Sequence, residues 1–210
     1  MNHPQARLLI LTKAPVPGQV KTRLIPLLGA QGAADFYTRL IHRCLDTATR
    51  SGLCPIELWC SPGRDAPFFK ACRERYDVEL REQSLGGLGR RMHLALECAL
   101  TRSTSAILIG ADCPSLGSAD LDESLTALSQ GADVVLGPAR DGGYYLVGMK
   151  RANPQLFANI RWGTPEVFDT TVARLDQQGV HYHCLSERTD VDTPKDYHRL
   201  LESDRLLMMN

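Results

Sequence analysis

Four consecutive apolar residues at positions 8–11 are followed at once by a loop rich in proline and glycine at positions 14–18. A short continuous apolar run of this kind is typical of a strand buried on both faces of a parallel sheet. After the loop, apolar residues recur at helical spacing between positions 33 and 48, which indicates an amphipathic helix. This opening predicts the first strand, loop and helix of an α/β fold.

The alternation of strand and helix patterns continues along the chain. Two later helices would begin at Thr164-Pro165 and Thr193-Pro194, where a hydroxyl N-cap precedes a proline. No repeat or linker-like stretch interrupts the pattern, so we expect residues 1–210 to form one domain, an α/β fold with a mainly parallel mixed sheet flanked by helices. The expected strands are 56–60, 78–80, 106–109, 134–136 and 144–149, and the expected helices are 66–76, 92–100 and 121–128.

The net charge and the cysteine content limit which binding partners and which cellular compartment we expect for this protein. Lys and Arg together number 24 and Asp and Glu also number 24, so no basic surplus points to nucleic acid or to an anionic membrane. The seven cysteines are odd in number and lack a C-x-x-C pair, which argues against disulfides and zinc knuckles. No apolar run approaches the roughly 18 residues of a membrane span. We therefore expect a cytoplasmic protein that binds a small neutral or anionic ligand.

The loop after the first strand has the composition of a phosphate-binding loop. It carries Lys13, Gly18, Lys21, Thr22 and Arg23 at the carboxyl end of a leading strand. Glycine allows the backbone to approach closely, while the cations and the hydroxyl supply charge and donors. The pattern matches neither the Walker A sequence nor G-x-G-x-x-G. A solvated basic turn is the alternative interpretation.

A second glycine-rich segment contains Gly86, Gly87, Leu88 and Gly89 and continues to Arg91. Its glycines would let the backbone approach a flat ligand or a phosphate. A flexible turn between a strand and a helix explains the same residues. Its combination with the first loop favours a ligand contact.

Three carboxylates occur where an open α/β sheet would bind its ligands. Asp112 follows the expected strand at 106–109, and the carboxyl ends of parallel strands form the usual ligand edge. Asp190 and Asp192 stand at alternate positions and would share one face of an extended segment. With Asp112 they could hold Mg²⁺, which takes one or two carboxylates plus substrate phosphates and waters. The alternatives are helix capping by Asp112 and electrostatic support of the following helix by Asp192.

A further turn joins Asp141, Gly142 and Gly143 to Tyr144 and Tyr145. Asp-Gly is a strong hairpin signal, and the two rings could equally be core packing or ligand contacts.

Other chemistry-bearing residues lack partners in the sequence. His181 and His183 have no third ligand nearby, so a zinc site is disfavoured. Cys113 has no histidine partner and is interpreted as a packing residue. The G-x-S-x-G turn of a serine hydrolase is absent from the sequence.

Taken in order, these motifs resemble the glycosyltransferase-like family linked to radical-SAM and arsenosugar-biosynthesis gene neighbourhoods. The resemblance covers about residues 7 to 200 and also places the chain in the nucleotide-diphospho-sugar transferase superfamily, which includes 2-phospholactate guanylyltransferase and the molybdenum-cofactor nucleotidyltransferases. The matching stretches are K-x-P-x-P-G-x-V-K-T-R-L at 13–24, G-L-G with Arg91, G-A-D-C-P at 110–114, D-G-G-Y-Y at 141–145, W-G-T at 162–164 and D-V-D-T-P at 190–194.

The resemblance implies a GT-A type fold with a nucleotide-binding N-terminal half, an acceptor-binding half after the central acid, and a divalent cation. On this basis Gly18, Lys21 and Arg23 would contact the di- or triphosphate, and residues 86–89 the nucleobase or ribose. The acceptor side would be formed by Gly142, Gly143, Tyr144, Trp162 and Thr164.

By the same resemblance Asp112, with Asp190 or Asp192, would hold Mg²⁺ or Mn²⁺. The chain departs from sugar transferases here, because Asp-Cys-Pro replaces their Asp-x-Asp and leaves Asp112 alone at the first metal position. That departure favours a metal site of the nucleotidyltransferase kind.

The sequence therefore predicts a metal-dependent transferase that moves a sugar from a nucleotide-diphospho-sugar to a small-molecule acceptor. Lys21, Arg23 and Asp112 would stabilise the leaving phosphate, and Asp141 is the candidate general base because it is the extra carboxylate of the acceptor motif. One alternative is nucleotidyl transfer from a nucleoside triphosphate with release of pyrophosphate. A second is a non-catalytic nucleotide-binding protein.

Overall fold

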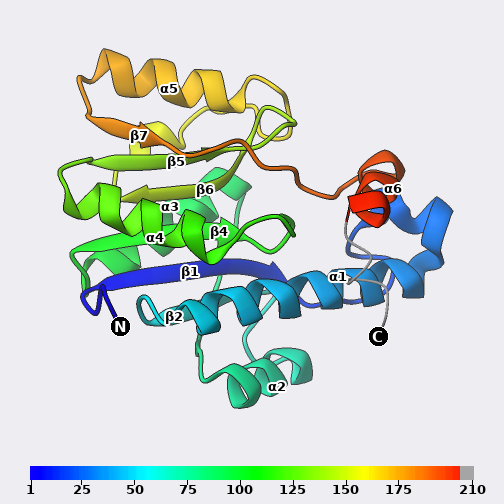
Figure 1. The fold of residues 1–210 in the computed structure, drawn as a ribbon. Coiled ribbons are helices and arrows are strands. Elements are labelled where there is room, and N and C mark those ends of the chain that lie inside the picture. The colour runs from blue at the N-terminus through cyan, green and yellow to red at the C-terminus, as the bar shows by residue number, and fades with distance from the viewer. Residues whose placement is uncertain (204–210) are drawn as a thin grey trace.

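A single seven-stranded sheet forms the centre of the computed structural model, which describes residues 1–203 (Figure 1). The strand order is β3-β2-β1-β4-β6-β5-β7. β6 pairs antiparallel with β4 and with β5, and the other neighbours pair in parallel. This arrangement confirms the predicted α/β class with a mainly parallel mixed sheet. The strands are β1 (Ala6–Lys13), β2 (Ile56–Ser61), β3 (Glu79–Glu82), β4 (Ser105–Gly110), β5 (Val134–Pro138), β6 (Tyr144–Met149) and β7 (Tyr182–Cys184).

The helices follow the predicted pattern with one marked extension. α1 begins well before position 33 and contains a break at Gly29, where φ is 69°. The extra turns contain Pro26, Gly29 and Gly32, which are typical of a loop, and this is why the sequence pattern did not indicate a helix there. The described helices are α1 (Ile25–Ser51), α2 (Pro67–Tyr76), α3 (Leu88–Leu100), α4 (Ser118–Ser129), α5 (Val167–Gln177) and α6 (Pro194–Ser203), with 3₁₀ segments η1 (Thr22–Leu24) and η2 (Pro154–Leu156).

The helices cover both faces of the sheet and bury its apolar strands. On one face α1, α2 and α4 pack over Leu8 and Ile10 of β1. On the other face α3 and α5 pack over Leu9, which points the opposite way because side chains alternate along a strand. This double covering explains the unbroken apolar run that begins the chain.

The C-terminal part of the chain returns to the edge where β1 and β4 end. After β7 it crosses this edge and reaches α6, which lies beside the start of α1 (Figure 1). The ring of Tyr197 in α6 meets the ring of Phe36 in α1 edge-on, with centroids 5.0 Å apart. This contact holds the segment that carries Asp190 and Asp192 across the open end of the sheet.

One of the two predicted helix starts is wrong. The hydroxyl of Thr164 donates to the carbonyl of Arg161 at 2.8 Å, and α5 begins at Val167 with Glu166 as its N-cap. Thr164 is used by a turn before the helix, which the Thr-Pro pattern does not distinguish from a cap. The second start is confirmed, because Thr193 and Asp196 form reciprocal hydrogen bonds at the start of α6.

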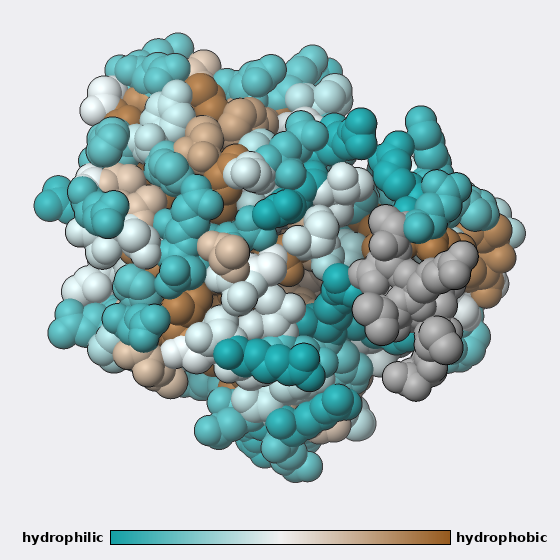
Figure 2. Space-filling view, viewed as in Figure 1, coloured by the Kyte–Doolittle hydropathy of each residue, from teal (hydrophilic) through white to brown (hydrophobic). Residues whose placement is uncertain are grey.

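The state of the cysteines and the character of the surface follow what the sequence analysis expected. All seven cysteines are free, and five of them are buried. In the described part of the chain no helix is long and apolar enough to span a membrane. The face in Figure 2 is largely hydrophilic, with apolar side chains in small separate patches.

Replacing Gly137 of β5 with alanine should destabilise the fold. A Cβ there would lie 2.5 Å from the ring of the buried Tyr145, so the ring must move. We expect the free energy of unfolding, measured in urea, to fall by about 1–3 kcal/mol. Gly63→Ala is the control, since the nearest atom to its Cβ would be 4.0 Å away. Equal stability of the two variants would contradict this packing.

Candidate active site

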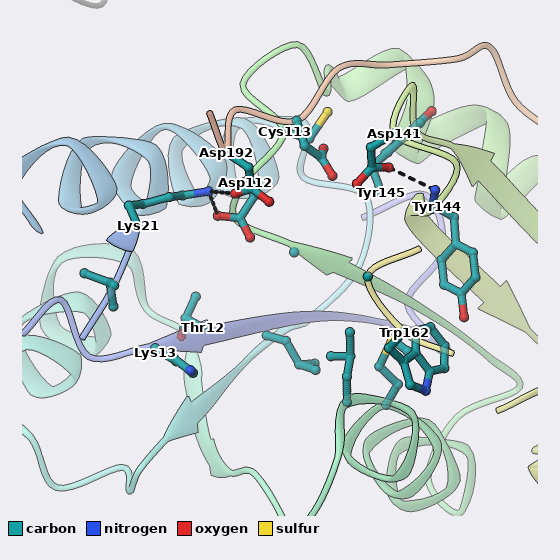
Figure 3. Close-up of a pocket in the computed structure, with 18 of the residues that line it drawn as sticks. Thr12, Lys13, Lys21, Asp112, Cys113, Asp141, Tyr144, Tyr145, Trp162 and Asp192 are labelled. Carbon is teal, nitrogen blue, oxygen red and sulfur yellow. Dashed lines mark hydrogen bonds and ion pairs between the residues drawn. The ribbon is translucent and has the colours of Figure 1, made fainter. Parts of the chain in front are cut away.

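A cavity of about 540 Å³ opens at the edge of the sheet where β1 and β4 end (Figure 3). Parallel pairing sets Leu11 opposite Gly110, so the residues that follow the two strands meet at this edge. Most of the predicted site residues line the cavity, although they come from six separate segments. They are Lys13, Lys21, Thr22, Arg23, Leu88, Arg91, Asp112, Asp141, Gly143, Tyr144, Trp162, Thr164, Asp190 and Asp192.

Five predicted glycines, Gly18, Gly86, Gly87, Gly89 and Gly142, are not among the lining residues. Two of them act on the cavity through close packing instead. A Cβ on Gly89 would lie 2.7 Å from the indole nitrogen of Trp162. Gly142 has a φ of 88°, and its Cβ would collide with the backbone of Pro165. These glycines therefore shape the wall that carries Trp162 and Thr164.

The ammonium of Lys21 lies at the centre of the acidic part of the site. Its Nζ is 2.5 Å from Asp112 Oδ1 and 2.7 Å from Asp192 Oδ1, and it donates to the carbonyl of Val191 at 2.9 Å. The Lys21 side chain is only 5% exposed. Burial alone would lower the pKa of this lysine, but the two carboxylates raise it above its ordinary value. Lys21 is therefore a buried cation neutralised by an aspartate pair.

Backbone hydrogen bonds bring the aspartates together. The N–H of Val191 donates to the carbonyl of Asp112 at 3.0 Å, which places Asp190 and Asp192 on either side of that contact. Further back, the guanidinium of Arg188 pairs with the carboxylate of Asp120 at 2.7 Å. The extended segment is thus fixed at two points. Its alternating carboxylates stand beside Asp112, as the sequence pattern predicted.

The third carboxylate, Asp190, has an unsatisfied oxygen. Its Oδ1 is buried and has no hydrogen-bond partner among the described residues. Burial raises the pKa of Asp190 to about 7, and the charges of Asp112, Asp141 and Asp192 act in the same direction. A buried oxygen without a donor is costly unless something positive approaches it.

The three aspartates offer the donor set of a hard cation. Mg²⁺ and Mn²⁺ take carboxylate oxygens, and the unsatisfied oxygen of Asp190 fits such a role. Within residues 1–203, however, no three His, Cys, Asp or Glu side chains are already arranged around a common point. Asp112 and Asp192 are arranged around Lys21 instead.

An aromatic wall lies on the side of the cavity away from Lys21 (Figure 3). Tyr144 and Trp162 meet edge-on, with ring centroids 6.0 Å apart and planes at 85° (Figure 3). Asp141 lies beside this wall, and its Oδ1 accepts the N–H of Gly143 at 2.9 Å. The cavity therefore has a cationic end, an acidic centre and an aromatic end.

Gln83 is a lining residue that the sequence analysis missed. Its buried Nε2 donates to the carbonyls of Thr12 at 2.7 Å and Trp59 at 2.8 Å. Its Oε1 accepts from the guanidinium of Arg91 at 3.0 Å. Gln83 thus joins the ends of β1 and β2 and orients a cavity-lining cation. The sequence could have indicated this residue, because it follows β3 directly and so lies at the same edge of the sheet as the other site residues.

Tyr37 was also missed, because on sequence it is only one apolar position of the α1 stripe. Its hydroxyl accepts the backbone N–H of Lys13 at 3.2 Å, and its ring lies 5.9 Å from the Lys21 ammonium. It therefore supports both lysines of the first loop.

Cys113 lies beside the acidic centre, with its thiol next to Asp190, whereas the two late histidines lie outside it. Cys113 is buried, and burial raises the pKa of its thiol to about 12, so the thiol stays protonated at neutral pH. His183 pairs with Glu123 at 2.8 Å on the surface, and His181 lies beside Gly131. The geometry agrees with a packing role for Cys113.

Comparison with known proteins gives a family and a set of similar structures. A family model described as "Uncharacterized protein conserved in bacteria (DUF2064)" matches residues 44–164. A search of curated proteins finds no match. A "putative nucleotide-diphospho-sugar transferase" from Desulfovibrio desulfuricans G20 is 29% identical, with a TM-score of 0.88 over 97% of this chain and 89% of that one.

Two more distant structures share the fold. Rv0371c from Mycobacterium tuberculosis H37Rv, solved in complex with manganese, is 21% identical, with a TM-score of 0.58 over 95% of this chain and 99% of that one. The 4-diphosphocytidyl-2C-methyl-D-erythritol synthase from Anaerococcus prevotii DSM 20548 is 12% identical, with a TM-score of 0.62 over 96% of this chain and 99% of that one. These likenesses confirm the nucleotide-diphospho-sugar transferase fold.

Replacing Gln83 with leucine should loosen the floor of the cavity. The carbonyls of Thr12 and Trp59 would lose their side-chain donor, and Arg91 would lose its acceptor. We expect the free energy of unfolding to fall by about 1–3 kcal/mol. Arg91→Leu is the control, because it removes only the bond to Arg91 and should cost less. The prediction fails if both variants lose the same stability in urea unfolding.

Proposed function

The chain belongs to the DUF2064 family, and we propose that it is a transferase that takes a nucleotide-linked donor, uses a divalent cation and modifies a small-molecule acceptor. We further propose that the group transferred is a sugar. One observation carries the proposal: a single cavity brings together cations, four aspartates and an aromatic wall. The fold likeness to a nucleotide-diphospho-sugar transferase supports it.

The cationic end of the cavity is the proposed donor site. Lys13 ends β1, Lys21 and Arg23 stand in and just after the loop that follows it, and Arg91 comes from the first turn of α3. Four cations in one cavity suit a diphosphate, because they neutralise the negative charge that develops as it leaves. Gln83 keeps the guanidinium of Arg91 in place by a 3.0 Å hydrogen bond. We assign the nucleobase and ribose to the neighbouring Leu88 side of the cavity.

The acidic centre is the proposed metal site. Asp112, with Asp190 or Asp192, would hold Mg²⁺ or Mn²⁺, and the unsatisfied Asp190 oxygen supports this assignment. When bound, the cation would add positive charge at the leaving diphosphate. Rv0371c, which shares the fold, was solved with manganese.

The aromatic end is the proposed acceptor site. Tyr144 and Trp162 offer apolar ring surface, while Thr164 offers a hydroxyl. Asp141 lies on the same side and is the proposed general base. It would take the proton of an acceptor hydroxyl as that oxygen bonds to the anomeric carbon of the sugar. The bond from that carbon to the phosphate oxygen breaks, and the nucleoside diphosphate departs.

Nucleotidyl transfer is the second candidate, and two observations favour it. The first loop supplies three cations to the cavity, enough for a triphosphate, and the strand end carries one aspartate in place of a pair. The synthase from A. prevotii shares the fold over 99% of the synthase chain. In this reaction an acceptor oxygen attacks the alpha phosphorus, and pyrophosphate leaves. The link to radical-SAM and arsenosugar neighbourhoods rests on the sequence resemblance and stays a prediction.

Thermal unfolding with a panel of nucleotides tests the proposal. Nucleoside triphosphates, nucleoside diphosphates and nucleotide sugars are each compared with and without Mg²⁺ or Mn²⁺. A ligand at 100 times its Kd should add about 2.7 kcal/mol of stability. Selective stabilisation by one nucleotide sugar supports sugar transfer and identifies the donor. Selective stabilisation by a triphosphate supports nucleotidyl transfer, and no metal-dependent shift with any nucleotide contradicts both.

Replacing Asp112 with asparagine should remove the metal dependence of nucleotide binding and abolish turnover. The variant keeps the size of the side chain but loses a carboxylate charge in the acidic centre. Isothermal titration with the donor found in the screen, with and without Mn²⁺, measures the effect. Asp122→Asn on α4, outside the cavity, is the matched control. Unchanged metal dependence in Asp112→Asn would exclude this residue from the metal site.

A further inference from the structure

In the proposed function Lys21 would have to bind two kinds of group, the donor phosphates and the aspartates, and one ammonium cannot bind both at once. As a residue of the first loop it would contact the donor phosphates. In the ligand-free chain, however, its ammonium lies within 2.7 Å of both Asp112 and Asp192, two of the three proposed metal ligands. The ammonium therefore holds the oxygens that a divalent cation needs.

We propose that Lys21 and the divalent cation compete for Asp112 and Asp192, so that tight metal binding requires the donor phosphates to draw Lys21 away. The inference rests on the proposed function and specifies the order in which its ligands bind. The donor would bind first or together with the metal, and the free protein would hold the metal weakly.

The contacts of Lys21 make it a strong competitor. It forms a third bond to the carbonyl of Val191 at 2.9 Å, and 95% of its side chain is removed from solvent. A metal ion entering beside Lys21 would be repelled by its ammonium and would have to displace that ammonium from the two carboxylates that neutralise it. It would also find the Oδ1 atoms of both carboxylates engaged in short hydrogen bonds. Both effects lower the affinity of the free protein for a metal.

The donor can reverse this competition because it supplies new acceptors for the same ammonium. Phosphate oxygens at the cationic end would replace the carboxylates as partners of Lys21. The carboxylates would then be released next to Asp190, whose Oδ1 already lacks a partner. By linkage, any ligand that withdraws Lys21 strengthens metal binding, and the metal strengthens donor binding by the same factor.

The backbone at Lys21 suits such a rearrangement. Its φ is 45° and its ψ is 42°, a left-handed conformation that residues other than glycine adopt rarely. It stands between the buried Val20 and the start of η1.

Direct Mn²⁺ titration of the nucleotide-free protein tests the proposal. Free Mn²⁺ is followed by its electron paramagnetic resonance signal, so no turnover is needed. Lys21→Met removes the competing ammonium and keeps a side chain of similar length. We expect it to bind Mn²⁺ about tenfold more tightly than the natural protein, within the usual range of coupling between two sites. Lys21→Gln is the second variant, should the methionine variant fail to fold.

The matched control is Lys13→Met, which removes a cation from the same cavity. Within residues 1–203 Lys13 forms no ion pair with the aspartates, and it is exposed, so Mn²⁺ affinity should change by less than about twofold. Equal or weaker Mn²⁺ binding by the Lys21 variants would overturn the competition. Asp112→Asn separates this failure from failure of the proposed metal site. If that variant binds Mn²⁺ as well as the natural protein does, the site is wrong too.

Discussion

The parallel pairing of β1 with β4 determines where the chemistry of this chain can occur. The register sets Leu11 opposite Gly110, so β1 continues for two residues past the end of β4, to Lys13. The loop that follows β1 carries Lys21, and the residue two places beyond Gly110 is Asp112. Neither segment could reach the other if β4 ran in the opposite direction. A backbone bond from Val191 to Asp112 then adds the late aspartates to the same edge.

Charge is distributed in the cavity so that the ligand-free protein remains stable. The chain has no net formal charge, yet its cavity gathers both cations and carboxylates. Such groups would repel or remain unsatisfied if each sign stood alone. Lys21 removes part of the repulsion among the carboxylates, because its ammonium neutralises two of them. In the binding order proposed above, the same ion pair must separate before the metal binds, which would link stability to the order of ligand binding.

The sequence predicted the secondary structure and most of the cavity lining, because both depend on local patterns. A buried strand is visible as an apolar run, and the residues after it must lie at the carboxyl edge of the sheet. The sequence did not indicate that Gln83 and Tyr37 belong to the site, because their roles depend on contacts with backbone atoms that are distant in the sequence. The pairing of Lys21 with Asp112 and Asp192 was equally hidden, since the sequence assigned these residues to separate phosphate and metal sites. Thr164 shows the opposite failure, where a correct local pattern served a turn and not a helix cap.

We propose that one cavity holds both the donor diphosphate and the divalent cation. A crystal structure with a nucleoside diphosphate and Mn²⁺, using the anomalous scattering of manganese, would show where each of them binds. We expect a manganese peak bound by Asp112, with the diphosphate against Lys21 and Arg23. We also expect the Lys21 ammonium to have left the two carboxylates. Nucleotide or manganese bound outside this cavity would contradict the proposed site.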